Sequence, residues 1–204
     1  MTDLLTPSER QRLDDGDDRR FYDQPRLVHH VDEGFRDRLT RLYAEHLEGG
    51  DEVLDLMGSW VSHLPDLEFD RVVGHGLNAE ELASNERYDE WFVQDLNGDP
   101  ELPFEDGSFD AVTCAVSVQY LQYPGTVFAE VGRVLRPGSV CVVSFSNRMF
   151  PQKAVRAWRE RDMDGRADLV SRYVGSTGSF EVPNIVREVP ERDPFYAVVA
   201  RLSG

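Results

Sequence analysis

From residue 52 onward, short apolar runs alternate with segments of helical spacing. The strand-like runs are EVLDLM (52–57), RVVGH (71–75), EWFVQD (90–95), FDAVTCAVSV (109–118) and SVCVVSF (139–145). Runs that are apolar at almost every position are typical of parallel strands buried on both faces. Alternation of strands with helices predicts an α/β protein with a mostly parallel sheet and helices on both faces. Its ligands are expected at the carboxyl ends of the strands.

The remaining elements follow from spacing and capping. Asp32 is a candidate cap for a helix over 32–48, whose apolar stripe is Phe35, Leu39, Leu42, Tyr43 and Leu47. Further helical segments are predicted to run through His63 and over 78–85, 125–135, about 151–161 and about 165–173. The run PFYAVVARL (194–202) is the last predicted strand, and a strand near 180–188 is able to pair with it.

The charge balance limits the classes of partner. There are 22 basic and 38 acidic residues, which give a net charge of −16. A negative surface repels phosphate backbones and anionic lipids, so nucleic acid and membrane are not expected partners. Lys153 is the only lysine among the basic residues. This composition predicts a halophilic protein, unless it merely reflects an arginine-rich proteome. A melting temperature independent of KCl concentration would contradict the prediction.

The 204 residues suit one domain with an extension. We divide the chain into an N-terminal helical cap over 1–48 and a domain over 49–204. No signal-peptide layout or membrane-length apolar run is found, so we expect a cytoplasmic protein, monomeric or homodimeric. Cys114 and Cys141 lie in apolar runs and are predicted to be buried free thiols. Neither they nor the five histidines have metal-ligand spacing, so no metal site is predicted.

One short motif favours a nicotinamide cofactor. Residues 74–79, GHGLNA, match G-x-G-x-x-A, and Asp95 lies 21 residues beyond Gly74. However, the strand before this motif is short, and the longer strand at 52–57 would be left without a role. Hydride transfer therefore stays the weaker alternative.

Two longer stretches resemble a known family. DLNGDPELPFEDGSFDAVTCAVSVQYL (95–121) has an acid at the end of a strand, then Leu-Pro-Phe, then Ser-Phe-Asp opening the next strand. EVGRVLRPGSVCVVSFSN (130–147) has a helix that ends in Leu-Arg-Pro-Gly, followed by a strand. Both resemble the class I S-adenosylmethionine-dependent methyltransferases, in particular the small-molecule group that contains the ubiquinone/menaquinone C-methyltransferases. The resemblance implies a three-layer Rossmann-like fold whose C-terminal strand is antiparallel.

The first two motifs of that family depart from its pattern here. Asp55 matches the acid of the first motif, but Met57, Ser59 and Val61 stand at the glycine positions, and Gly58 is one place off. The acid that binds the ribose hydroxyls falls at Gly76. We interpret this as a variant loop that still binds S-adenosylmethionine. The alternative is a binding or regulatory module that keeps the fold without the reaction.

The resemblance also implies a donor site. Asp55 would lie near the methionine end, Asp95 and Leu96 would contact the adenine, and Val116 and Ser117 would lie beneath the cofactor. The variant loop would contribute Met57, Gly58 and Ser59, and the ribose side would be lined by Gly74, His75, Gly76, Leu77 and Asn78, with Asn78 supplying the hydrogen bond. Arg26 would pair with the carboxylate of the donor.

The acceptor side is predicted from residues at the expected ligand edge. Tyr22, Tyr120, Asn147, Arg148 and Phe150 are candidates to shape a small-molecule pocket. His30 is the candidate catalytic base, because the pKa of imidazole lies near neutrality; the alternative is a polar surface position. Trp60 is either a lid over the donor or a core residue. The acceptor and the methylated atom cannot be read from the sequence.

Overall fold

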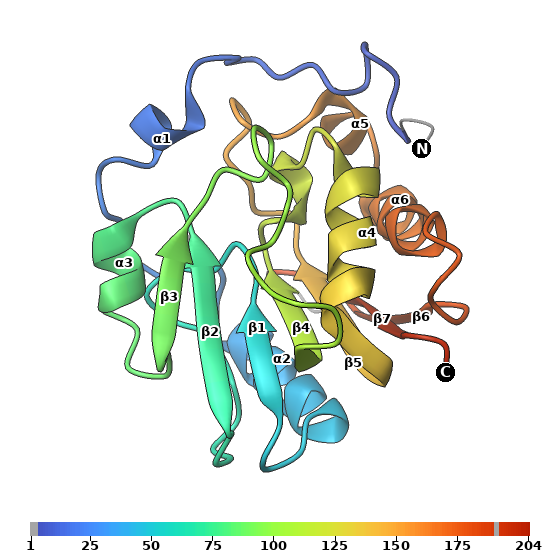
Figure 1. Ribbon diagram of the computed structural model, residues 1–204. Coiled ribbons are helices and arrows are strands. Elements are labelled where there is room, and N and C mark those ends of the chain that lie inside the picture. The colour runs from blue at the N-terminus through green and yellow to red at the C-terminus, as the bar shows by residue number, and fades with distance from the viewer. Residues whose placement is uncertain (1–3, 190–191) are drawn as a thin grey trace.

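The computed structural model describes residues 4–189 and 192–204, and a seven-stranded sheet forms its centre (Figure 1). The strands lie in the order β3-β2-β1-β4-β5-β7-β6. Strands β1 to β5 pair in parallel, whereas β7 is antiparallel to both β5 and β6. The strand bounds are β1 Glu52–Asp55, β2 Arg71–Gly76, β3 Glu90–Val93, β4 Phe109–Ala115, β5 Leu135–Phe145, β6 Asn184–Glu188 and β7 Phe195–Arg201. The predicted mostly parallel sheet with an antiparallel C-terminal strand is confirmed.

Helices cover both faces of the sheet, which gives the predicted three layers (Figure 1). One apolar cluster joins α2 to one face, and a larger one joins α4 to α6 and the other face. The helical elements are α1 Asp18–Phe21, α2 Glu33–His46, α3 Ala79–Ala83, the 3₁₀ turn η1 Val118–Tyr120, α4 Pro124–Val134, α5 Arg156–Arg159 and α6 Met163–Gly175.

Helix α2 forms as its sequence predicts. The Asp32 carboxylate accepts a hydrogen bond from Phe35 N at 2.8 Å and so satisfies one free amide of the first turn. Phe35 and Leu39 on its apolar stripe are fully buried. They belong to the same cluster as Val53 of β1 and Val142 of β5, so the stripe holds the helix on the sheet.

The predicted helix through His63 does not exist, and residues 56–70 are a coil. Two backbone positions are already incompatible with a helix, because Met57 and His63 both have a left-handed backbone, with φ of 57° and 59°. Coil residues Leu64 and Phe69 nevertheless pack against the α2 cluster. The coil therefore covers sheet surface without forming a helix.

Side chains of β2 and of the segment between β2 and β3 satisfy the backbone of this coil. His75 Nδ1 accepts from Met57 N at 3.0 Å, and Asn85 Nδ2 donates to Ser59 O at 2.9 Å. Arg87 Nη2 donates to the carbonyls of Pro65 and Leu67 at 2.9 and 3.0 Å. Backbone groups that lack partners in a helix or sheet must find them elsewhere, and these side chains supply them.

The helix predicted near 151–161 is also shorter than expected, and only α5 (Arg156–Arg159) forms. Its first amides donate to the N-terminal segment, from Arg156 N to Gln11 O at 2.7 Å and from Ala157 N to Glu9 O at 3.0 Å. In the part of the chain that the structure describes, no helix has both the length and the apolar character needed to cross a bilayer.

Residues 4–31, which we call the strap, cross above the carboxyl ends of the parallel strands (Figure 1). The strap contains α1 and leads into α2. It contacts the segment after β5 through Asp14 N, which donates to Gln152 O at 2.9 Å. The division into a cap over 1–48 and a domain over 49–204 stays a prediction.

Candidate functional site

A cavity of about 340 Å³ lies between the strap and the carboxyl ends of the strands. Its floor includes Asp55 at the end of β1, Gly76 at the end of β2 and Val116 just after β4. These strand ends flank the point where the strand order reverses, which is where open α/β sheets bind ligands. The volume lies within the usual range for small-molecule sites.

Most of the predicted site residues line this one cavity. From the donor side these are Arg26, Asp55, Met57, Gly58, Ser59, His75, Gly76, Leu77, Asn78, Asp95, Leu96, Val116 and Ser117. From the acceptor side they are Tyr22, Tyr120, Arg148, Phe150 and the candidate base His30. Their roles toward a ligand stay predictions.

Two predicted residues do not line the cavity. Gly74 lies inside β2 beneath the ring of Tyr88, and a Cβ at Gly74 would lie 2.2 Å from that ring. Asn147 is exposed after β5 and lies outside the lining. The position of Gly74 also counts against a nicotinamide loop. A phosphate-binding motif needs its glycines in the turn after the strand, and both Gly74 and Gly76 are part of the strand here.

Backbone strain is concentrated around the cavity. Met57, His63 and Val116 are the non-glycine residues with positive φ in the described part of the chain, and all three line the cavity. Val116 is β-branched, which makes its φ of 53° unfavourable. Met57 stands at the first glycine position of the family motif and keeps the left-handed conformation that glycine adopts freely. Strain of this kind gathers at functional sites.

Asp55 forms a buried carboxylate at the floor of the cavity. It is 1% exposed and accepts hydrogen bonds from Tyr88 Oη at 2.6 Å and from Thr113 Oγ1 at 2.9 Å. Removal from water raises the pKa of Asp55 to about 7, although both hydroxyls favour the ionised form. Its charge state therefore changes near neutral pH.

His75 connects the loop after β1 to the end of β3. Its Nδ1 accepts from Met57 N at 3.0 Å, and its Nε2 faces the carbonyl of Gln94 at 2.9 Å. This pattern assigns the proton to Nε2. Burial lowers the pKa of His75 to about 4, so the ring is neutral and acts as a bridge between two loops of the site.

Arg26, a residue of the strap, lies among aromatic rings. Its guanidinium carbon is 4.9 Å from the ring centre of Phe21, 5.6 Å from that of Tyr22 and 5.1 Å from that of Phe150. Nη2 donates to Phe21 O at 2.9 Å. Nη1 is buried without a hydrogen-bond partner, and Arg26 lines the cavity. A buried N–H of a cation without a partner favours an anionic group from a ligand.

His30 and Trp60 both line the cavity. The ring of His30 is 5.4 Å from that of Phe150, and partial removal from water lowers the pKa of His30. Its neutral form, which can accept a proton, is therefore favoured at pH 7. The ring of Trp60 lies tilted against that of His29, with ring centres 4.8 Å apart, and Trp60 Nε1 donates to Val28 O at 3.3 Å. Trp60 is thus half-buried against the strap rather than in the core.

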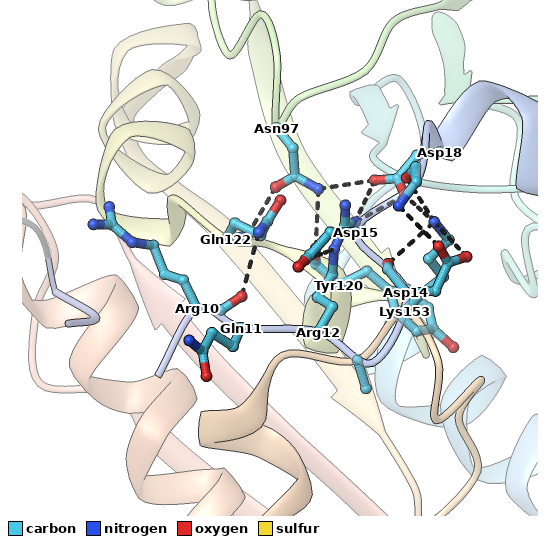
Figure 2. A network of polar contacts seen from close by, with 12 residues as sticks. Arg10, Gln11, Arg12, Asp14, Asp15, Asp18, Asn97, Tyr120, Gln122 and Lys153 are labelled. Atoms are coloured by element: carbon cyan, nitrogen blue, oxygen red, sulfur yellow. Dashed lines mark hydrogen bonds and ion pairs between the residues drawn. The ribbon is translucent and has the colours of Figure 1, made fainter. Parts of the chain in front are cut away.

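The strap is attached to the site by a cluster of buried charges, shown in Figure 2. The carboxylate of Asp18 accepts two hydrogen bonds from Arg12 Nη1, at 2.8 and 2.6 Å, and one from Asn97 at 3.3 Å. Lys153 Nζ lies 3.1 Å from Asp18 and donates to Gly16 O at 2.8 Å. Asp18 and Lys153 are 6% and 1% exposed. We call Arg12, Asp18, Asn97 and Lys153 the latch.

Among the residues of this region that sequence reasoning missed are Tyr88, Glu81 and Lys153. Tyr88 and Glu81 were not considered because nothing in their spacing separates them from surface residues of a short helix and a loop. Lys153 was noted for its rarity alone. Its burial could have been suspected, because a single lysine in an acidic chain has many possible partners, but its place in the latch depends on the tertiary structure.

Comparison with known sequences finds similarity to methyltransferases. Residues 56–143 match the model of a methyltransferase domain. The ubiquinone/menaquinone biosynthesis C-methyltransferase UbiE of Brucella canis is 29% identical over 106 residues, which are 50% of this chain and 38% of that protein. The UbiE protein of Desulfotalea psychrophila is 43% identical over 53 residues, or 26% of this chain and 20% of that protein. The chain therefore aligns with well under half of these relatives.

Solved structures agree on the fold. An S-adenosylmethionine-dependent methyltransferase from Mesorhizobium loti has a TM-score of 0.55 at 17% identity, covering 79% of this chain and 95% of its own. The [4+2]-cyclase SpnF has a TM-score of 0.62 at 16% identity and covers 88% of each chain. A phosphoethanolamine N-methyltransferase of Haemonchus contortus, solved with S-adenosyl-L-methionine, has a TM-score of 0.60 at 12% identity over 84% of this chain and 52% of its own.

Proposed function

We propose that the chain is a class I S-adenosylmethionine-dependent methyltransferase that transfers a methyl group from S-adenosylmethionine to a small-molecule acceptor, which the match to a methyltransferase domain over residues 56–143 supports. The main support is the single cavity that collects the predicted donor residues of three strand ends together with the strap. The strain at Met57, His63 and Val116 also marks this cavity as the functional region.

The residues present fit the donor at its two ends. The unpartnered Nη1 of Arg26 suits the carboxylate of the methionine part. Asp95 and Leu96 follow β3 on the cavity wall, where the family contacts the adenine. Asp95 Oδ1 accepts from Asn97 N at 3.0 Å, and no group of the described residues donates to its other oxygen, which suits an exocyclic amine. When bound, S-adenosylmethionine supplies a methyl group on a positively charged sulfur.

The remaining wall suits a small acceptor. Tyr120 and Phe150 stack with ring centres 6.1 Å apart, and Tyr22 meets both rings edge-on. Such a surface would hold and orient an apolar or aromatic molecule and exclude water. His30, which borders these rings, would accept a proton from the acceptor.

A second candidate is a module with the same fold that binds a ligand without methyl transfer. The observation that favours it is the missing ribose acid at Gly76, together with the lost glycines of the first motif. The neighbour described as a [4+2]-cyclase is a further reason to test transfer directly, because one fold carries different reactions.

Calorimetry in molar KCl tests the donor site first. We expect S-adenosylmethionine and S-adenosylhomocysteine to bind at micromolar concentrations and NADH not to bind. Arg26→Gln should weaken both sulfur ligands at least tenfold, whereas Arg19→Gln, on the exposed side of α1, should not. Absence of binding to folded protein would contradict the proposal.

Transfer is tested with methyl-labelled donor and a panel of phenols, amines, thiols and carboxylic acids. Transfer of the label to an acceptor by wild type, and its loss in the variant His30→Gln, would support the proposed methyl transfer. Tight donor binding without transfer to any compound in the panel favours the binding module.

A further inference from the structure

The end of β2 cannot supply the acid that usually binds the ribose hydroxyls of the donor. A Cβ added to Gly76 would lie 2.7 Å from the Gly58 carbonyl oxygen and 3.2 Å from Leu82 Cδ2. The first distance is far below ordinary contact, and its atom belongs to the backbone. The loop after β1 therefore passes through the space where the acid side chain would begin.

This path of the loop is fixed by β2 itself. Gly58 N donates to His75 O at 2.6 Å, and Met57 N donates to His75 Nδ1 at 3.0 Å. A loop held this close to β2 requires Gly76, and Gly76 cannot carry an acid. The altered first motif and the missing acid are thus one structural change rather than two independent losses.

Asn78, which the sequence suggested as a replacement, is committed elsewhere. Its Oδ1 accepts from Glu81 N at 2.9 Å and caps α3. Its Nδ2 donates to the carbonyls of Tyr22 at 2.8 Å and Asp23 at 3.2 Å. Both amide hydrogens are used to connect α3 to the strap, so the prediction that Asn78 binds the ribose is not supported.

Four carboxylates line the cavity. Three of them are held by other protein groups or lie away from the end of β2, where the ribose is expected. Asp18 is held in the latch, Asp55 is held by Tyr88 and Thr113, and Asp95 lies beyond β3 at the adenine end. The fourth, Glu81, lies in the first turn of α3, the helix that follows β2, and is 9% exposed.

We infer that the Glu81 carboxylate binds the ribose hydroxyls of the donor. The acid for this role then lies in the first turn of α3 and not at the end of β2. Its Oε2 accepts from Ser59 Oγ at 2.5 Å, and its Oε1 accepts from Arg26 N at 2.7 Å. A carboxylate offers about four acceptor positions, so two remain for a pair of ligand hydroxyls. This inference rests on the proposed function.

Glu81 would also couple the ribose to the strap. The same carboxylate contacts the variant loop through Ser59 and the strap through Arg26 N. A purely structural role for Glu81 is therefore the explanation that an experiment must separate from ribose binding.

The experiment compares two ligands and three proteins by calorimetry. The ligands are S-adenosylhomocysteine and its 2′,3′-dideoxy analogue, which lacks both ribose hydroxyls. The proteins are wild type, Glu81→Gln and the matched control Glu80→Gln, whose side chain is exposed on the same helix. We expect Glu81→Gln to weaken S-adenosylhomocysteine by about 10- to 100-fold, as for hydrogen bonds to a charged group, and the dideoxy analogue by less than about threefold. Glu80→Gln should change neither.

The outcomes separate ribose binding by Glu81 from a purely structural role of Glu81. Equal losses for both ligands in Glu81→Gln would overturn the inference, because they would show that Glu81 only positions the strap and loop. No loss for either ligand would overturn it as well. If folded wild type binds no S-adenosylhomocysteine, the proposed function fails and the inference fails with it. Thermal melts check folding, and Glu81→Asp, which keeps the carboxylate, replaces Glu81→Gln if that variant does not fold.

Discussion

Strands β4, β5 and β7 are held by apolar side chains, whereas the carboxyl ends of β1 and β2 are held by buried polar groups. Val112, Val143 and Val198 in the first set are fully buried among other apolar residues. In the second set the buried groups include Asp55 and His75, each with hydrogen bonds to a neighbouring loop or strand.

This difference between apolar and polar stabilisation follows where the sequence keeps the methyltransferase motifs and where it departs from them. The apolar half contains the stretches that resemble the family closely, and helices α4 and α6 form near the predicted places. The polar half contains the lost glycines, the missing acid and the coil over 56–70. Where the usual loop is absent, directional hydrogen bonds take its place, and each of them requires a particular side chain.

The largest effect on stability is expected from the apolar half. Phe145 is fully buried on β5 and packs edge-on against Trp158 at 5.0 Å. Phe145→Ala should lower the free energy of unfolding by about 3–5 kcal/mol in urea titrations. Phe145→Leu should lower it much less, and folded protein should bind S-adenosylhomocysteine as wild type does. A loss below about 1 kcal/mol would contradict our account of this half.

Restoring the family residue in the polar half should be harmful. Gly76→Asp would place its Cβ against the Gly58 carbonyl, and overpacking of this kind lowers stability by about 1–3 kcal/mol. We also expect loss of S-adenosylhomocysteine binding, measured by calorimetry. Gly175→Ala is the control, because nothing lies within 4 Å of an added Cβ there. Improved binding in Gly76→Asp would show that the loop does not follow the path described.

Tyr88→Phe should test the buried carboxylate of Asp55. The hydroxyl of Tyr88 favours the ionised form, so its removal should raise the pKa of Asp55 above about 7. Hydrogen bonds to charged groups contribute about 1.5–3 kcal/mol and neutral ones about 0.5–1.5 kcal/mol. The variant should therefore lose more stability at pH 8.5 than at pH 4.5. Tyr123→Phe, at an exposed tyrosine, should lose little at either pH.

The sign of this pH dependence follows from linkage. Asp55 has a folded pKa above its unfolded value of 3.8, so its contribution is fully present below about pH 4 and is lost as pH rises through 7. His75 acts oppositely: its folded pKa of about 4 lies below 6.5, so its contribution is lost as pH falls through 4. The difference between wild type and Tyr88→Phe isolates Asp55, because His75 is common to both. A difference independent of pH would contradict the assignment.

The smallest effect is expected at Met57. A left-handed backbone costs about 1–2 kcal/mol for a residue with a Cβ, and glycine removes this cost. Met57→Gly should be about 1 kcal/mol more stable than Met57→Ala in urea titrations, because both lack the packing of the methionine and differ in strain. Equal stabilities would show that φ at this position is not strained.

Much of the fold could be predicted from the sequence, because the spacing of apolar residues indicates which faces of helices and strands are buried. The stripe from Phe35 to Leu47 marked α2, and the apolar runs at 109–118 and 139–145 marked the central strands. Most of the residues predicted to bind the donor line one cavity, because they were placed at the ends of predicted parallel strands. The prediction of a short helix through His63 was wrong. The apolar residues of this segment suggested a helix, but Met57 and His63 have a left-handed backbone.

Only the tertiary structure decided how the variant site is built. Tyr88 and Asp55 lie 33 positions apart, and Arg26 and Glu81 lie 55 apart, yet each pair is joined by a hydrogen bond. The latch likewise joins Asp18 to Lys153, which lie 135 positions apart in the sequence. The sequence alone determined which segments are buried, because burial repeats with the local geometry of helix and strand. It did not determine which polar groups meet, because hydrogen bonds between distant segments produce no repeating pattern in the sequence.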